Sequence, residues 1–155
     1  MSKRIELELP DVGITIKATL KEEDEPELCN DLWKRLETPL KMFCRHPVST
    51  GYEFSAEARP PRHPVETGTQ AAPIGRKRWL FTKIEPGMVI YSIVGGYGGI
   101  SVCYGPCTEP LPARSSVTAE VDEKDMSNLV KAGRAVWNAQ YVTHRPMVLI
   151  VRREE

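Results

Sequence analysis

The segment that most constrains the fold runs from Glu85 to Gly105, with the sequence EPGMVIYSIVGGYGGISVCYG. A Glu-Pro-Gly turn precedes a β-branched run, Met88–Val94, and a second run, Ile100–Tyr104, follows the glycine-rich stretch Gly95–Gly99. This pattern predicts two strands joined by a loop. Four glycines exceed the two special residues that a minimal hairpin turn needs, and glycine suits backbone with positive φ or a close approach. The loop is therefore either a wide hairpin connection or the rim of a pocket.

Runs in which apolar and polar residues alternate recur along the chain, as is typical of strands buried on one face. Two longer segments, Glu25–Leu36 and Asp122–Tyr141, place apolar residues at helical spacing instead, and Asp122 is expected to cap the second helix. The predicted strands are Ile5–Leu9, Ile14–Leu20, Tyr52–Ala58, Trp79–Thr82, Met88–Val94, Ile100–Tyr104, Ala113–Val121 and Met147–Val151.

About eight short strands, joined mostly by turns, predict a mainly β protein built as a closed barrel. The two flanking helices are expected to cover the open ends of that barrel. A chain of 155 residues is the size of one domain and can bury a substantial core, so we expect a single domain over residues 1–155.

The charge balance bears on partners and location. Lys and Arg number 21, as do Asp and Glu, and the two signs are mixed along the chain, so neither a nucleic acid nor a membrane is expected as a partner. Residues 1–10 lead into a strand without an apolar signal region, which predicts a cytoplasmic protein. The apolar terminal strand and the long proline-rich loop at 59–76 leave a homo-oligomer open.

The sequence offers no sign of a cofactor or a metal. The stretch Gly95–Gly99 precedes a strand rather than a helix, so it does not match a dinucleotide-binding fingerprint. Cys103 and Cys107 lack the spacing of a redox pair, and no second Cys/His pair lies at zinc-finger spacing. We expect these cysteines to be buried apolar residues, with no cofactor and no metal in the protein.

The segments PGMVIYSIVGG and GGISVCYGP, with the late helix and terminal strand, resemble a family of small, mostly uncharacterised bacterial cyclophilin-like proteins. This family includes the cucumopine and mikimopine synthases. A second point of resemblance is Cys44–Glu53, where the family is expected to carry a Trp-Ser-Gly-Glu-like turn. Here the turn keeps His46 and Ser49, reads Val48 at the Trp position and inserts Thr50.

The resemblance covers residues 5–151 and implies a cyclophilin-like barrel and a small carboxylate-bearing substrate. The synthases are implied to condense histidine with 2-oxoglutarate in a cofactor-free, Pictet–Spengler type reaction, which is lyase-type chemistry in opine biosynthesis. Such chemistry needs a proton donor, a base and cationic groups for carboxylates. The alternative is a non-catalytic module that binds a small molecule or a peptide. Prolyl isomerase activity is disfavoured, because the Phe-His-Arg and Met-Gln-Gly-Gly motifs of cyclophilins are missing from the sequence.

Three residues are candidates for catalysis. His46 titrates near neutral pH and suits proton transfer, or it is a surface loop histidine. Glu53 alternates with Tyr52 and Phe54, so it is either a general base with a raised pKa at a barrel mouth or a solvent-facing side chain. Tyr97 stands among glycines, where it either closes over a ligand or pins the loop.

Four more residues are candidates for substrate binding. Arg45 suits a carboxylate or a surface ion pair, and Ser49 lies in the same turn. Tyr104 ends its strand at either the rim or the core, and Lys83 could supply an amine for a Schiff base. The expected pocket lies at one barrel mouth, walled by the segment 44–53 and the glycine-rich loop.

Overall fold

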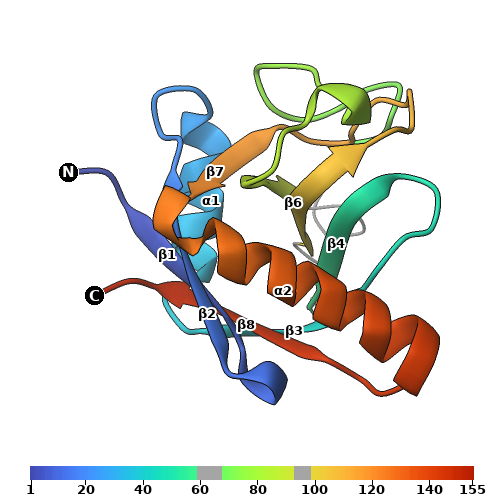
Figure 1. Ribbon diagram of the computed structural model, residues 1–155. Helices are drawn as coiled ribbons and strands as arrows, with labels where there is room; N and C mark the ends of the chain where they lie inside the picture. The colour runs from blue at the N-terminus through green and yellow to red at the C-terminus, as the bar shows by residue number, and fades with distance from the viewer. Residues whose placement is uncertain (59–67, 93–98) are drawn as a thin grey trace.

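The computed structural model describes residues 1–58, 68–92 and 99–155, which form one closed barrel of eight antiparallel strands (Figure 1). The strands are β1 (Arg4–Leu9), β2 (Ile14–Leu20), β3 (Leu40–Arg45), β4 (Gly51–Glu57), β5 (Met88–Ser92), β6 (Gly99–Cys107), β7 (Val117–Val121) and β8 (Val148–Arg153). Around the barrel they follow the order β1-β2-β7-β5-β6-β4-β3-β8. Two α-helices, α1 (Pro26–Arg35) and α2 (Met126–Asn138), complete the fold. The predicted fold class is confirmed.

One predicted strand is wrong, and one strand was missed. The run Trp79–Thr82 forms only an isolated bridge, from Leu80 to Pro112, before a 3-10 turn at Phe81–Lys83. The strand that the sequence analysis missed is β3, which pairs with both β4 and β8. Its alternation is hidden in the sequence, because the large apolar side chain of Phe43 lies on the exposed face.

Other element boundaries also differ from the prediction. β7 begins at Val117 rather than at Ala113. Asp122 does not cap a helix with its side chain, because its carboxylate is bound by the Arg4 guanidinium. α2 ends at Asn138, and a π-helical turn, Ala139–Thr143, follows it.

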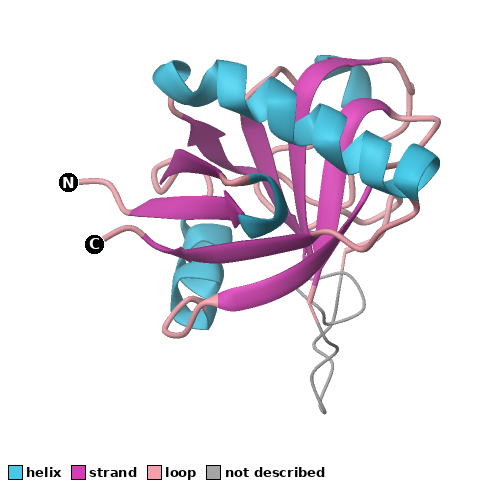
Figure 2. Ribbon diagram, turned by 60° about the horizontal axis from the view of Figure 1, so that its bottom comes forward, coloured by secondary structure: helices cyan, strands magenta, loops and turns pink. Residues whose placement is uncertain are grey.

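The main core fills the inside of the barrel, because alternate residues of each strand point inward. On β6, for example, Ile100, Val102 and Tyr104 belong to this core, whereas Cys103 faces the other way. The two helices lie on opposite sides of the barrel (Figure 2) and both contribute leucines to the same core. In the described ranges, no helix combines the length and the apolar character that crossing a membrane requires.

A second, smaller apolar cluster lies outside the barrel, on the outer face of β5 and β6. It contains Ile84, Ile90, Cys103, Cys107, Ala113 and Val117. Because Ile84 and Ala113 come from the segments before β5 and after β6, these segments cover part of the outer barrel wall.

The two cysteines of this cluster are buried free thiols, as predicted. Their sulfur atoms lie 3.7 Å apart in the apolar layer. Nowhere in the described part of the chain do three His, Cys, Asp or Glu side chains gather as a metal site requires.

A close contact between α2 and β6 predicts a strong effect for Gly133→Ala. An added Cβ would lie 2.3 Å from Cδ1 of the Tyr104 ring. Overpacking of this kind costs about 1–3 kcal/mol, more than the roughly 1 kcal/mol that alanine gains over glycine in a helix. We expect Gly133→Ala to lower the free energy of unfolding in urea, while Lys131→Ala on the exposed face of α2 changes it little. An unchanged urea midpoint for Gly133→Ala would contradict the contact.

Candidate functional site

A cavity of about 570 Å³ lies against the outer face of β4, β5 and β6. Its floor consists of Glu53, Ser55 and Glu57 on β4, Ile90 and Ser92 on β5, and Ser101 on β6. Its rim comes from the β3–β4 turn, the connection between β6 and β7, and the residues just after α2. The predicted position at a barrel mouth is therefore wrong. Inward-pointing side chains fill the barrel, so the side chains that alternate with them point outward from the barrel wall.

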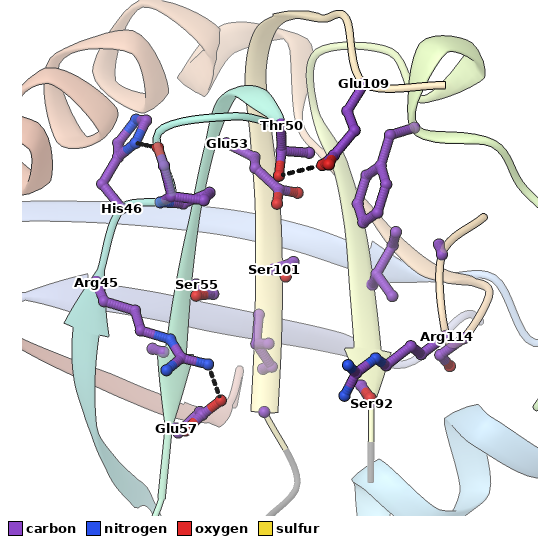
Figure 3. A pocket seen from close by; sticks show the side chains of 18 of the residues that line it. Arg45, His46, Thr50, Glu53, Ser55, Glu57, Ser92, Ser101, Glu109 and Arg114 are labelled. Carbon is purple, nitrogen blue, oxygen red and sulfur yellow. Dashed lines mark hydrogen bonds and ion pairs between the residues drawn. The ribbon is translucent and has the colours of Figure 1, made fainter. Parts of the chain in front are cut away.

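Two carboxylates and a hydroxyl group meet at one end of the cavity (Figure 3). Glu53 on β4 and Glu109 in the β6–β7 connection point toward one another, and the Thr50 hydroxyl donates to Glu109 at 3.1 Å. The Glu53 side chain is buried, with 6% of the residue exposed. Burial, and secondly the charge of Glu109, raise the pKa of Glu53 to about 7, against the smaller opposing effect of the nearby Thr50 hydroxyl. Glu53 therefore exchanges a proton near neutral pH.

The position of Thr50 depends on the glycine that follows it. Gly51 has φ of 128°, and a Cβ there would lie 2.6 Å from the Pro106 carbonyl oxygen. The close approach lets the Thr108 amide donate to the Thr50 carbonyl at 2.9 Å. The pairing of β4 with β6 shifts in register between Gly51 and Glu53, and it is regular from Glu53 onward. Glycine at this position is required to bring Thr50 beside Glu109.

His46 is buried, and both of its ring nitrogens bond within the protein. Nδ1 lies 2.7 Å from the Pro47 carbonyl oxygen, and Nε2 lies 2.6 Å from the Tyr104 hydroxyl. Because a carbonyl only accepts, we assign the hydrogen to Nδ1, so Nε2 accepts from Tyr104. Burial lowers the pKa of His46, which favours this neutral form. The ring stands apart from the Glu53 carboxyl (Figure 3), so the contacts of His46 are those of a structural residue.

The backbone of His46 is held to the end of α2. Its amide donates to Gln140 Oε1 at 2.6 Å, and its carbonyl accepts from Gln140 Nε2 at 2.9 Å and from the Tyr141 hydroxyl at 2.6 Å. The Trp137 ring packs against the imidazole in a T-shaped contact. These contacts fasten the β3–β4 turn, and with it one side of the cavity.

The other predicted residues divide between the cavity and elsewhere. Arg45 lines the cavity, but its guanidinium forms an ion pair with Glu57 at 2.5 Å. Tyr104 is a buried core residue and does not line the cavity. Ser49 and Lys83 are exposed and also lie outside it.

The structure therefore brings Arg45, His46 and Glu53 to one cavity. Tyr97 lies outside the described residues, as does most of the glycine-rich loop.

Sequence reasoning missed Thr50, Glu109 and Arg114, all of which line the cavity. Alternation from Glu53 identifies Ser55 as facing the same way, because strand residues two apart share a face. No comparable pattern marks Glu109, since it lies in an irregular proline-rich connection. Only folding brings it beside Glu53.

Comparison with solved structures shows a similarity to McbB, in a structure of McbB in complex with tryptophan. The two chains share 32% sequence identity with a TM-score of 0.78, over 97% of this chain and 44% of the McbB chain. The chain thus spans less than half the length of McbB. No family model and no curated protein matches the chain. The similarity to McbB supports the barrel fold over nearly the whole chain, while the resemblance to the cucumopine synthases stays a prediction.

The raised pKa of Glu53 predicts a pH-dependent gain in stability for Glu53→Gln. Between pH 4.5, the ordinary pKa of glutamate, and about 7, the unfolded state releases a proton that the folded state retains. The free energy of unfolding therefore falls as pH rises through this window, by up to ~3 kcal/mol. Glu53→Gln removes this loss, so urea denaturation should show its advantage over wild type growing from pH 4.5 to pH 8.

Glu57→Gln, on the same strand and half-buried, is the matched control and should show no such growth. His46 is present in every variant, so its own titration cancels in the comparison. A difference between Glu53→Gln and wild type that stays constant with pH would contradict the raised pKa.

Proposed function

We propose that this protein is an enzyme that uses Glu53 as proton donor and acceptor to condense an amino acid with a small 2-oxo acid, in a Pictet–Spengler type reaction. The observation that carries the proposal is the buried Glu53 carboxyl group, which faces the cavity beside Glu109 and has a pKa of about 7. A group with this pKa is present in both protonation states at neutral pH, as acid and base catalysis in one cycle requires.

Glu53 gives up one proton and recovers one proton in each catalytic cycle. The neutral amine of the amino acid adds to the ketone carbon, and one of its protons passes to the ketone oxygen. Protonated Glu53 then gives its proton to the resulting hydroxyl, which leaves as water, and an iminium ion remains. An electron-rich ring carbon of the amino acid then bonds to the iminium carbon. The Glu53 carboxylate takes the proton from that ring carbon, which restores the ring and returns Glu53 to its protonated form. The sum is one molecule from two, with loss of water.

The similarity to a protein whose structure contains tryptophan supports an amino acid as the amine component. The composition of the cavity also supports an enzyme over a passive binding module. An open apolar groove would favour a module, whereas this cavity combines carboxyl, hydroxyl and guanidinium groups with apolar side chains such as Phe81 and Ile90. An apolar wall beside a few polar groups is typical of a small-molecule site.

Incubation of the protein with tryptophan and a panel of 2-oxo acids tests the proposal directly. Mass spectrometry should detect a product whose mass is the sum of the two reactants less one water. Because general acid–base catalysis contributes about 10²–10⁴-fold in rate, Glu53→Gln should lower kcat by that factor. Glu57→Gln should lower it far less. Full turnover by Glu53→Gln would remove Glu53 from the mechanism.

Two neighbouring substitutions should move the pH profile in opposite directions. The charge of Glu109 raises the pKa of Glu53, so Glu109→Gln should shift the Glu53 limb of kcat/KM to lower pH. The nearby Thr50 hydroxyl lowers the same pKa, so Thr50→Val should shift that limb to higher pH. Shifts of the same sign in both variants would show that the limb belongs to another group.

A further inference from the structure

The end of the cavity opposite the two carboxylates carries a positive charge. Arg114, in the connection between β6 and β7, lines the cavity, and its guanidinium extends toward the level of Ser92 (Figure 3). Glu53 and Glu109 lie at the other end, so the cavity has an acidic end and a basic end. Ser55 and Ser101 lie on the floor between these ends.

The two arginines of the cavity differ in their partners. Arg45 is neutralised by Glu57 within the protein. Within residues 1–58, 68–92 and 99–155, no acidic side chain lies within ion-pair distance of Arg114. An arginine at the cavity wall that has no ionic partner among these residues matches a ligand with one negative charge.

The backbone around Arg114 is held in place from both sides. The Ala113 amide donates to the Trp79 carbonyl at 2.8 Å, and the Arg114 carbonyl accepts from the Ile74 amide at 3.1 Å. The Ser115 hydroxyl donates to the Tyr91 carbonyl at 2.6 Å. Arg114 thus stands between two buried neighbours, with its side chain exposed to the cavity. Because the backbone is already anchored, no loop has to be ordered when the guanidinium binds a ligand.

The register of the sheet sets the separation of the two ends. Glu53 pairs with Cys103 on β6, and Ser92 pairs with Gly99 on the same strand. Four residues of β6 separate these levels, which corresponds to about 13 Å at the usual rise of a strand. The carboxylate of an α-amino acid lies only two bonds from its nitrogen, so one such molecule cannot reach both ends.

We infer that Arg114 is an anion subsite, which binds a carboxylate that the substrate or second reactant carries several bonds from the reacting atoms. The planar guanidinium fork binds a carboxylate with two parallel hydrogen bonds. A single positive charge without an ionic partner in the described part of the chain favours this monoanionic group over a dianionic phosphate. The inference rests on the proposed function, which assigns the reaction to the acidic end of the cavity.

Binding of glutarate tests the subsite without turnover, because this dicarboxylate has no ketone and cannot condense. Calorimetric titration should show glutarate binding to the wild type and at least about tenfold weaker binding to Arg114→Gln, as expected for loss of a charged hydrogen bond. Arg114→Lys should give an intermediate affinity, because lysine keeps the charge but not the fork. Arg78→Gln, an exposed arginine outside the cavity, is the control and should bind glutarate as the wild type does.

Tryptophan distinguishes the two ends of the cavity. Its affinity should change less than about twofold in Arg114→Gln and should be the same with and without saturating glutarate, because separate subsites bind independently. The inference is overturned if wild type does not bind glutarate, if Arg114→Gln binds it normally, if glutarate and tryptophan compete, or if inorganic phosphate binds at Arg114 more tightly than glutarate. The proposed function fails by a different result, namely undiminished turnover by Glu53→Gln.

Discussion

The strict alternation of side chains along β4 and β6 is the constraint on which the rest of the molecule depends. In a closed barrel, every strand residue whose side chain does not fill the interior must point outward. Phe54 and Val102 therefore enter the core, and Glu53 and Ser101 face outward from the same strands. A slip of one residue in β4 would turn Glu53 into the barrel and expose Phe54, and the same slip in β6 would exchange Ser101 and Val102. The stability of the fold and the orientation of the site thus have one cause.

An outward side chain on a barrel is ordinarily exposed to solvent, and the added outer layer changes that for Glu53. The β3–β4 turn and the β6–β7 connection cover this part of the wall, and they bring Thr50 and Glu109 to the carboxyl group. The turn is held from behind by His46, Gln140 and the end of α2. Hydrogen bonds remote from the Glu53 carboxyl group therefore maintain the surroundings that raise its pKa.

Much of the barrel could be predicted from the sequence, because alternation reports which face of a strand is buried. Alternation failed to identify β3, because both of its faces carry apolar side chains and Phe43 lies on the exposed face. It also predicted a strand at Trp79–Thr82, where Trp79 and Phe81 are apolar because they pack on the outer wall of the barrel and do not pair in the sheet. At the site, alternation separated Glu53 from Phe54 correctly. It could not show that the outer wall, rather than a barrel mouth, would be enclosed.

The sequence by itself determined the class of fold, the pairs of residues that share a face, and Glu53 as a carboxylate directed away from the core. Only the tertiary structure decided that this carboxylate is buried, that Glu109 lies beside it, and that His46 uses both ring nitrogens on Pro47 and Tyr104. The physical reason is that a pKa and a hydrogen-bond partner are properties of the surroundings. Those surroundings come from irregular connections distant in the chain, which carry no periodic signal.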